Sequence, residues 1–116
     1  MNPLDREGYP FIWSAFLFQS AANPPTLTGG MNFSSINTFL GGEPVHSRVN
    51  VGIYRMVFTN PVLTLGLTFF YSNPGTSDSY PVARIDASTV EWRHYVLPTN
   101  VLSDNGFFNL MVVVIR

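Results

Sequence analysis

The stretch that decides the fold runs from Val49 to Pro61 and has the sequence VNVGIYRMVFTNP. Counted in twos, its residues separate into one set of Gly52, Tyr54, Met56 and Phe58 and another of Val51, Ile53, Arg55, Val57 and Thr59. Alternating β-branched and aromatic residues favour a pleated strand, and Pro61 ends it. Both faces are largely apolar, and a strand of this kind has something packed on each side. We therefore expect one face in the domain's own core and the other against a second copy of the chain.

The composition indicates a single domain that associates with itself. The chain has 116 residues, the size of one domain, and we assign residues 1–10 to a flexible arm and residues 11–116 to the domain. Charged residues make up 11% of the chain, against about 25% in an average globular protein, while aromatic residues make up 15%. A monomer with so few charges exposes apolar surface, which typically marks an interface.

Several classes of partner are not expected. The chain has no cysteine, so neither a disulfide framework nor a thiolate zinc site is possible. Its net charge of −1 provides no basic field for nucleic acid. No apolar run approaches the ~20 residues of a membrane-spanning helix, so we expect no membrane insertion. The run Phe11–Phe18 lacks the positively charged leader of a signal sequence, and we interpret it as a strand.

The remaining chain is divided by turn-forming residues into short apolar runs. These runs cover Phe11–Phe18, Met31–Phe39, Leu63–Ser72, Tyr80–Asp86, Val90–Leu97 and Phe107–Ile115. Gly66 suggests a bulge, and the Asn105-Gly106 pair tolerates the positive φ of a tight hairpin. No stretch has the periodicity of an amphipathic helix. The sequence therefore predicts an all-β, antiparallel β-sandwich or jelly roll of about seven strands or more.

No motif in the chain indicates catalysis, so we predict that the protein is not an enzyme. His46, in a predicted loop, and His94, in a predicted strand, lack metal-site spacing, so we expect no metal or cofactor. The chain has no GxSxG motif and no glycine-rich phosphate loop. A small hydrolase remains a separate hypothesis, which requires a cleft where one of these histidines meets a carboxylate.

Two stretches carry side chains suited to binding. Between Tyr71 and Tyr80, two tyrosines flank a polar loop, and flat rings with short polar groups suit sugars and peptides. The alternative is a solvated loop whose tyrosines fold into the core. In the second stretch, Glu91–Tyr95, the side chains of Trp92 and His94 share one face. The predicted ligand-binding residues are Tyr71, Asn73, Asp78, Tyr80, Trp92 and His94.

Arg55 is the charged residue on the second face of the opening stretch. An unpaired buried charge is costly, so we expect an acidic partner on a neighbouring strand or a neighbouring chain. Glu91 and Arg93, which share a face, are expected to pair with charges on an adjacent strand. We predict Ile53, Arg55 and Val57 as interface residues of a homo-oligomer.

Four segments, in this order, resemble the small β-structured tip domains of phage tail-fibre proteins. They are IWSAF at 12–16, NFSSI at 32–36, GIYRMVFT at 52–59 and FFNLMV at 107–112. The resemblance implies a virion structural protein that forms a homotrimer at the distal end of a fibre and contacts a host-surface glycan or protein. It implies no particular binding residues. Because such domains end a longer fibre, a baseplate, collar or capsid-surface subunit fits equally well, and a cellular lectin-like or adhesin-like module is the alternative.

Overall fold

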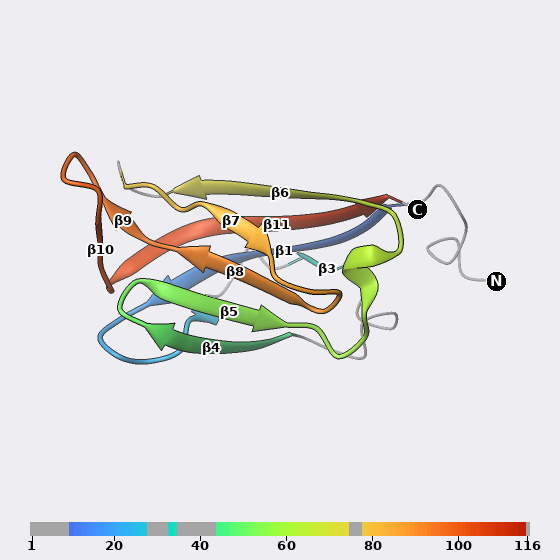
Figure 1. Cartoon of the computed structure of the whole chain (residues 1–116), viewed down its shortest axis with the longest axis horizontal. Coiled ribbons are helices and arrows are strands. Elements are labelled where there is room, and N and C mark those ends of the chain that lie inside the picture. Colours follow the sequence, from blue (N-terminus) through green and yellow to red (C-terminus); the bar gives the residue numbers. More distant parts are fainter. Residues whose placement is uncertain (1–9, 28–32, 35–43, 75–77, 116) are drawn as a thin grey trace.

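Strands make up nearly all regular structure in the computed structural model, which describes residues 10–27, 33–34, 44–74 and 78–115 (Figure 1). Five strands in this part form sheet A, in the order β2-β1-β11-β6, with β3 paired to β1. Their bounds are Pro10–Gln19 for β1, Thr26–Leu27 for β2, Phe33–Ser34 for β3, Leu67–Pro74 for β6 and Gly106–Ile115 for β11. The antiparallel pairing of β1 with β11 extends from Pro10 opposite Ile115 to Gln19 opposite Gly106. These two strands thus pair along their whole length.

Two further antiparallel sheets complete the described fold. Sheet B has the order β4-β5-β8-β7, and sheet C pairs β9 with β10. Their bounds are Val45–Asn50 for β4, Ile53–Val57 for β5, Val82–Arg84 for β7, Thr89–Arg93 for β8, Tyr95–Val96 for β9 and Val101–Leu102 for β10. A short 3-10 turn, η2 (Val62–Thr64), lies between β5 and β6. In Figure 1, sheet B lies in front of sheet A, and β9 and β10 extend beyond both.

The core lies between the inner faces of sheets A and B. Trp13 of β1 meets Phe58 edge-on with ring centroids 6.4 Å apart, and Trp92 of β8 lies 4.6 Å from Phe108 of β11. Aromatic pairs at these distances add to the free energy gained by burying apolar area. The buried residues of this core are Trp13, Ala15, Leu17, Tyr54, Met56, Phe58, Val62, Leu63, Tyr80, Val90, Trp92, Phe108, Leu110, Val112 and Val114. The prediction of an all-β antiparallel sandwich is therefore confirmed.

The opening stretch contains a hairpin turn as well as a strand. Asn50 ends β4, Gly52 adopts a φ of +68°, and β5 begins at Ile53. A glycine is required at this position, because a Cβ would lie 2.7 Å from the backbone nitrogen of Ser103. The predicted alternation holds beyond the turn, where Tyr54 and Met56 are buried and Val57 is exposed. The prediction of one continuous strand from Val49 is thus wrong, because Gly52 reverses the chain.

Three other local predictions need correction or lie outside the described residues. Gly66 precedes β6 and forms no bulge, since the pairing of β6 with β11 is continuous. Asn105 has the expected positive φ of 68°, but it connects sheet C to sheet A and does not close a hairpin, because β10 pairs with β9. Of the strand predicted over Met31–Phe39, only Phe33–Ser34 is described, as β3.

Candidate functional site

The outer face of sheet A is an apolar surface built by the long strands. Side chains on β11 alternate between core and exterior, and the pairing with β1 and β6 carries this alternation across the sheet. We use "outer face" for the described exterior side chains: Ile12, Ser14, Phe16 and Phe18 of β1; Phe107, Asn109, Met111, Val113 and Ile115 of β11; and Leu67, Phe69, Tyr71 and Asn73 of β6. The polar exceptions are Ser14, Asn73 and Asn109, and each is neutral.

Side chains of β6 are the most accessible on this face. Leu67, Phe69 and Tyr71 are 68%, 53% and 59% exposed. On the inner strands of the sheet the rings cover one another, as Phe16 and Phe107 do with centroids 5.8 Å apart. β6 has a neighbouring strand on one side only, because it ends the described order of sheet A. Its apolar side chains therefore lose the most contact with water if another surface covers the face.

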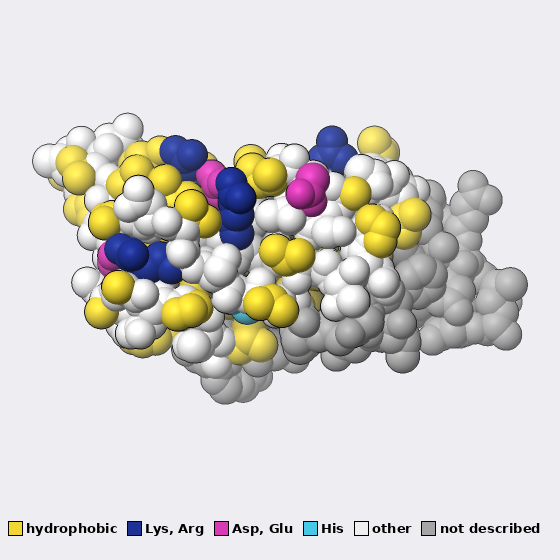
Figure 2. Space-filling model, turned by 60° about the horizontal axis from the view of Figure 1, so that its bottom comes forward, with side chains coloured by type: hydrophobic (Ala, Val, Ile, Leu, Met, Phe, Trp, Pro, Cys, Tyr) yellow, Lys and Arg dark blue, Asp and Glu magenta, His cyan; other side chains and the backbone are white. Residues whose placement is uncertain are grey.

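The predicted interface residues lie instead on the exterior of sheet B. Arg55 is directly opposite Glu91 of β8, and its Nε lies 3.1 Å from Glu91 Oε2. Arg93 reaches the other oxygen of the same carboxylate, with Nη2 3.1 Å from Oε1. The expected acidic partner of Arg55 on a neighbouring strand is thus confirmed, and it lies in the same chain. Figure 2 shows a side of the molecule where small clusters of charged side chains interrupt the hydrophobic ones.

Ile53 and Val57 flank this ion-pair cluster. Val57 is 40% exposed and Ile53 is half-buried, so neither is enclosed within the single chain. A partner surface placed over sheet B would have to cover both arginines, which costs free energy unless their charges stay paired. The outer face of sheet A imposes no such cost. The role of Ile53, Arg55 and Val57 at an interface stays a prediction. For association, the exterior of sheet B is less favourable than the outer face of sheet A.

The structure separates the predicted ligand-binding residues into exposed and buried sets. Tyr71 and Asn73 are exposed and available for contact. Tyr80, Trp92 and His94 belong to the core: Tyr80 stacks on His94 with centroids 4.7 Å apart and packs against Trp92 at 6.3 Å. Direct ligand contact by these last three side chains, as the sequence predicted, does not fit their burial. The alternative of loop tyrosines folded into the core holds for Tyr80 but not for Tyr71.

Asp78 and His94 form the histidine–carboxylate pair that a hydrolase would need. His94 Nε2 lies 2.7 Å from Asp78 Oδ2. However, the histidine side chain is only 2% exposed, and Tyr80 covers its ring. A substrate therefore has no approach to this imidazole, and the pair fixes the chain after β6 to the end of β8. The second histidine, His46, was expected in a solvated loop, but it lies half-buried in β4 with its ring 6.0 Å from that of Trp13.

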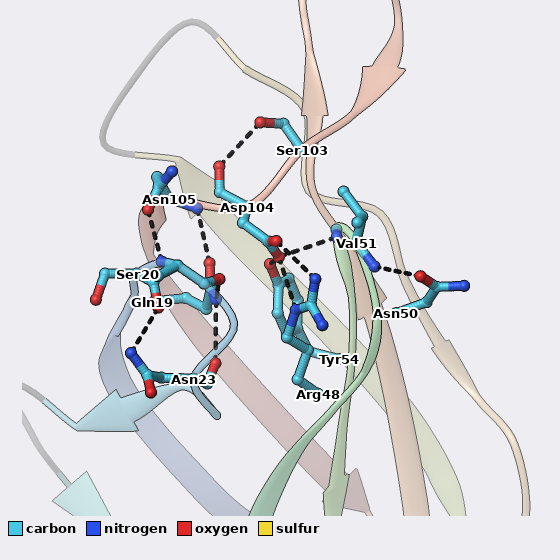
Figure 3. Close-up of polar contacts among 12 residues, drawn as sticks. Gln19, Ser20, Asn23, Arg48, Asn50, Val51, Tyr54, Ser103, Asp104 and Asn105 are labelled. Atoms are coloured by element: carbon cyan, nitrogen blue, oxygen red, sulfur yellow. Dashed lines mark hydrogen bonds and ion pairs between the residues drawn. The ribbon is translucent and has the colours of Figure 1, made fainter.

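A polar cluster around Asp104 joins the two main sheets at one end of the sandwich (Figure 3). The Asp104 carboxylate accepts hydrogen bonds from the Arg48 guanidinium, the Tyr54 hydroxyl and the Gly52 backbone N–H, all in the β4–β5 hairpin. The guanidinium of Arg48 lowers the pKa of Asp104 to about 2, and burial raises the pKa of Tyr54. This carboxylate is therefore ionised at neutral pH and holds the hairpin in place.

The neighbouring Asn105 makes the corresponding contacts to sheet A. Its backbone N–H donates to Gln19 Oε1 at 2.7 Å, and its side-chain Oδ1 accepts from the Ala21 N–H at 2.7 Å. Gln19 in turn donates to the Ala21 and Asn23 carbonyls, which closes the turn after β1. The sequence predicts only a turn at residues 103–106. The sequence signal for these polar contacts is the cluster of short polar side chains at residues 103–106. Such a cluster does not identify partners that are distant in the sequence.

Comparison with known proteins adds no identification. No protein-family model, curated protein or solved structure matches this chain. Within the described residues, no group of three or more histidine or acidic side chains is placed to hold a metal ion. The same residues include no helix long and apolar enough to cross a membrane.

Proposed function

We propose that this protein is a structural subunit of a tailed-phage virion, a homo-oligomer that binds a host-surface glycan or protein through its loops. The observation that carries the proposal is the outer face of sheet A, which is apolar along three long strands and has no charged side chain among its described residues. A subunit that functions alone in water would expose this face permanently, whereas a subunit of a permanent assembly covers it.

The two ends of the sandwich differ in a way that suits a distal subunit. Pro10 lies opposite Ile115, so the chain enters and leaves sheet A at one end (Figure 1). We call the opposite end the distal end. It carries the turns after Gln19 and Asn50, and hydrogen bonds join both turns to the connection Ser103–Asn105. An assembly that anchors the terminal end therefore directs the distal end outward.

Neutral polar side chains at the distal end fit an uncharged ligand rich in hydroxyl groups. Asn23, Asn50, Asn73, Thr99 and Asn100 are all exposed there. Amides and hydroxyls both donate and accept hydrogen bonds, which matches the groups of a sugar. These features support a glycan as the host ligand.

The assembly part of the proposal is tested by light scattering on the purified chain over a range of concentrations. We expect a mass that is a multiple of 12.9 kDa, and the resemblance to tail-fibre tips favours three copies. A species of 12.9 kDa at every concentration contradicts the proposal. Neighbouring genes for tail and capsid proteins are expected, and genes for secretion and cell-wall anchoring would favour an adhesin-like module.

The binding part is tested with fluorescently labelled oligomer on whole bacterial cells, with and without periodate oxidation of their surface glycans. Labelling of some strains that is lost after oxidation is the expected result. The double variant Thr99→Ala and Asn100→Ala, in the exposed loop between β9 and β10, should reduce this labelling and leave the oligomer mass unchanged. Ser47→Ala, on the exterior of sheet B, is the matched control. Equal labelling by both variants would exclude the distal end as the contact surface.

A further inference from the structure

Strand β6 presents a long edge whose own residues lack the usual protection against pairing. It runs from Leu67 to Pro74 and ends the described order of sheet A. Soluble proteins protect such edges with charged side chains, prolines or bulges. β6 has no charged residue, its single proline is at its last position, and its pairing with β11 is continuous. An edge of this kind is expected to be covered in the functional state.

The exposed apolar area on the same side approaches the size of a specific interface. If each of these large side chains presents about 150–250 Å², the exposed fractions of Phe18, Leu67, Phe69, Tyr71 and Ile115 leave roughly 500 Å² uncovered. The half-buried side chains of β1 and β11 add to this area. A stable interface buries about 800 Å² on each partner, while the largest apolar patch of a typical monomer is about 300–600 Å². The outer face therefore approaches the area that association requires.

The charge pattern favours a second copy as the occupant. The outer face has no charged side chain among its described residues, so it neither attracts nor orients a charged partner. Its best complement is another neutral, apolar, sheet-like surface, and each copy of the chain supplies one. The exterior of sheet B is less suitable, because the Arg55–Glu91–Arg93 cluster would be buried there.

We infer that a second copy of this chain covers the outer face of sheet A, with Leu67, Phe69 and Tyr71 of β6 inside the contact. This inference rests on the proposed function, since it requires that the protein is a homo-oligomer. It replaces the interface predicted from the sequence, which placed Ile53, Arg55 and Val57 at the contact. The two surfaces lie on opposite sides of the sandwich, so they can be tested separately.

The first experiment compares two triple variants by light scattering. The sheet A variant carries Leu67→Thr, Phe69→Thr and Tyr71→Thr, and the matched sheet B variant carries Val45→Thr, Ile53→Thr and Val57→Thr. Threonine keeps the strand propensity in both. We expect the sheet A variant to self-associate about 100-fold more weakly and the sheet B variant to keep the wild-type mass. Emission from the buried Trp13 and Trp92 reports that each variant is folded.

A second measurement avoids destabilising substitutions. Because the chain has no cysteine, Tyr71→Cys and Val45→Cys each introduce a single thiol. In the oligomer, we expect a maleimide probe to react at least tenfold more slowly at position 71 than at position 45, with equal rates once the oligomer is diluted to monomer. Equal rates within an intact oligomer would overturn the inference.

The outcomes separate this inference from the proposed function. A wild-type oligomer that survives the sheet A substitutions but dissociates with the sheet B substitutions overturns the inference and leaves the homo-oligomer standing. A monomeric wild-type chain overturns both. If that monomer also sediments with neutral phosphatidylcholine vesicles, the occupant of the outer face is lipid and not a second copy.

Discussion

Arg48 and Asp104 face each other across the distal end, with Arg48 Nη2 2.8 Å from Asp104 Oδ2 and Nε 3.2 Å from Oδ1. This two-point contact joins the β4–β5 hairpin to the connection that leads into β11, 56 residues further along the chain. Paired hydrogen bonds between a guanidinium and a carboxylate fix geometry as well as charge. Because this contact holds the distal end together, its loss should lower the free energy of unfolding by a measurable amount.

Replacement of Asp104 by Asn should destabilise the fold by about 1–2 kcal/mol at pH 7, because charged hydrogen bonds to buried partners are lost. The pKa of Asp104 is 3.8 in its ordinary state and about 2 in the folded chain, mainly because of Arg48. The folded chain therefore binds fewer protons than the unfolded chain between these values, and stability falls as the pH falls toward 2. Urea denaturation of both proteins from pH 7 to pH 2 should show the difference shrinking below about pH 4. Parallel stability curves would contradict this.

Replacement of Gly52 by Ala should destabilise the chain by about 1–3 kcal/mol, because φ is positive and the backbone of Ser103 leaves no room for a Cβ. Thermal unfolding followed by circular dichroism measures the effect. Gly66→Ala is the control, since Gly66 is exposed and its φ lies outside the left-handed region. It should be neutral or slightly stabilising. Equal melting temperatures for the two variants would contradict the hairpin geometry.

Replacement of Tyr80 or Trp92 by Ala should act on stability and not on ligand contact. Both side chains are buried between the sheets, and removal of a buried aromatic ring costs about 3–5 kcal/mol. Asn73→Ala, at an exposed position, should change the free energy of unfolding by less than about 0.5 kcal/mol. Urea denaturation provides the comparison. A fully stable Tyr80→Ala variant that has lost cell binding would restore the ligand role predicted from the sequence.

Replacement of Glu91 by Gln should leave Arg55 and Arg93 adjacent without their shared counter-ion. The two arginine side chains are 41% and 43% exposed, so water screens much of the repulsion between their charges. We expect a smaller loss of stability than for Asp104→Asn, and added salt should reduce it further. The measurement is thermal unfolding at low and high ionic strength. A loss that does not change with salt would indicate packing and not charge as the cause.

Much of the fold follows from local properties of the sequence. The alternation of Phe107–Ile115 determined that this segment is a strand with apolar residues on both sides, and the structure has it as β11. Turn-forming residues placed most breaks between strands correctly, and the lack of amphipathic-helix periodicity argued against a helical fold. Arg55 indicated a nearby acid, because an unpaired charge in a strand has few other options. Hydrophobic periodicity, strand propensity and the cost of an unpaired buried charge are properties of a few neighbouring residues, so they can be recognised in the sequence.

Only the tertiary structure decided which side of each strand packs into the core and which side is exposed. The sequence could not show that Tyr80, Trp92 and His94 turn inward while Tyr71 turns outward, because the side of each segment that is covered depends on how the sheets stack. It could not show that Asp104 reaches Arg48 or that Asn105 reaches Gln19, because these partners are set by how the sheets stack. The outer face of sheet A likewise arises from the lateral order of β1, β11 and β6, which are distant in the sequence. Strand order and packing depend on contacts between segments that are distant in the sequence, and a local sequence pattern does not specify those contacts.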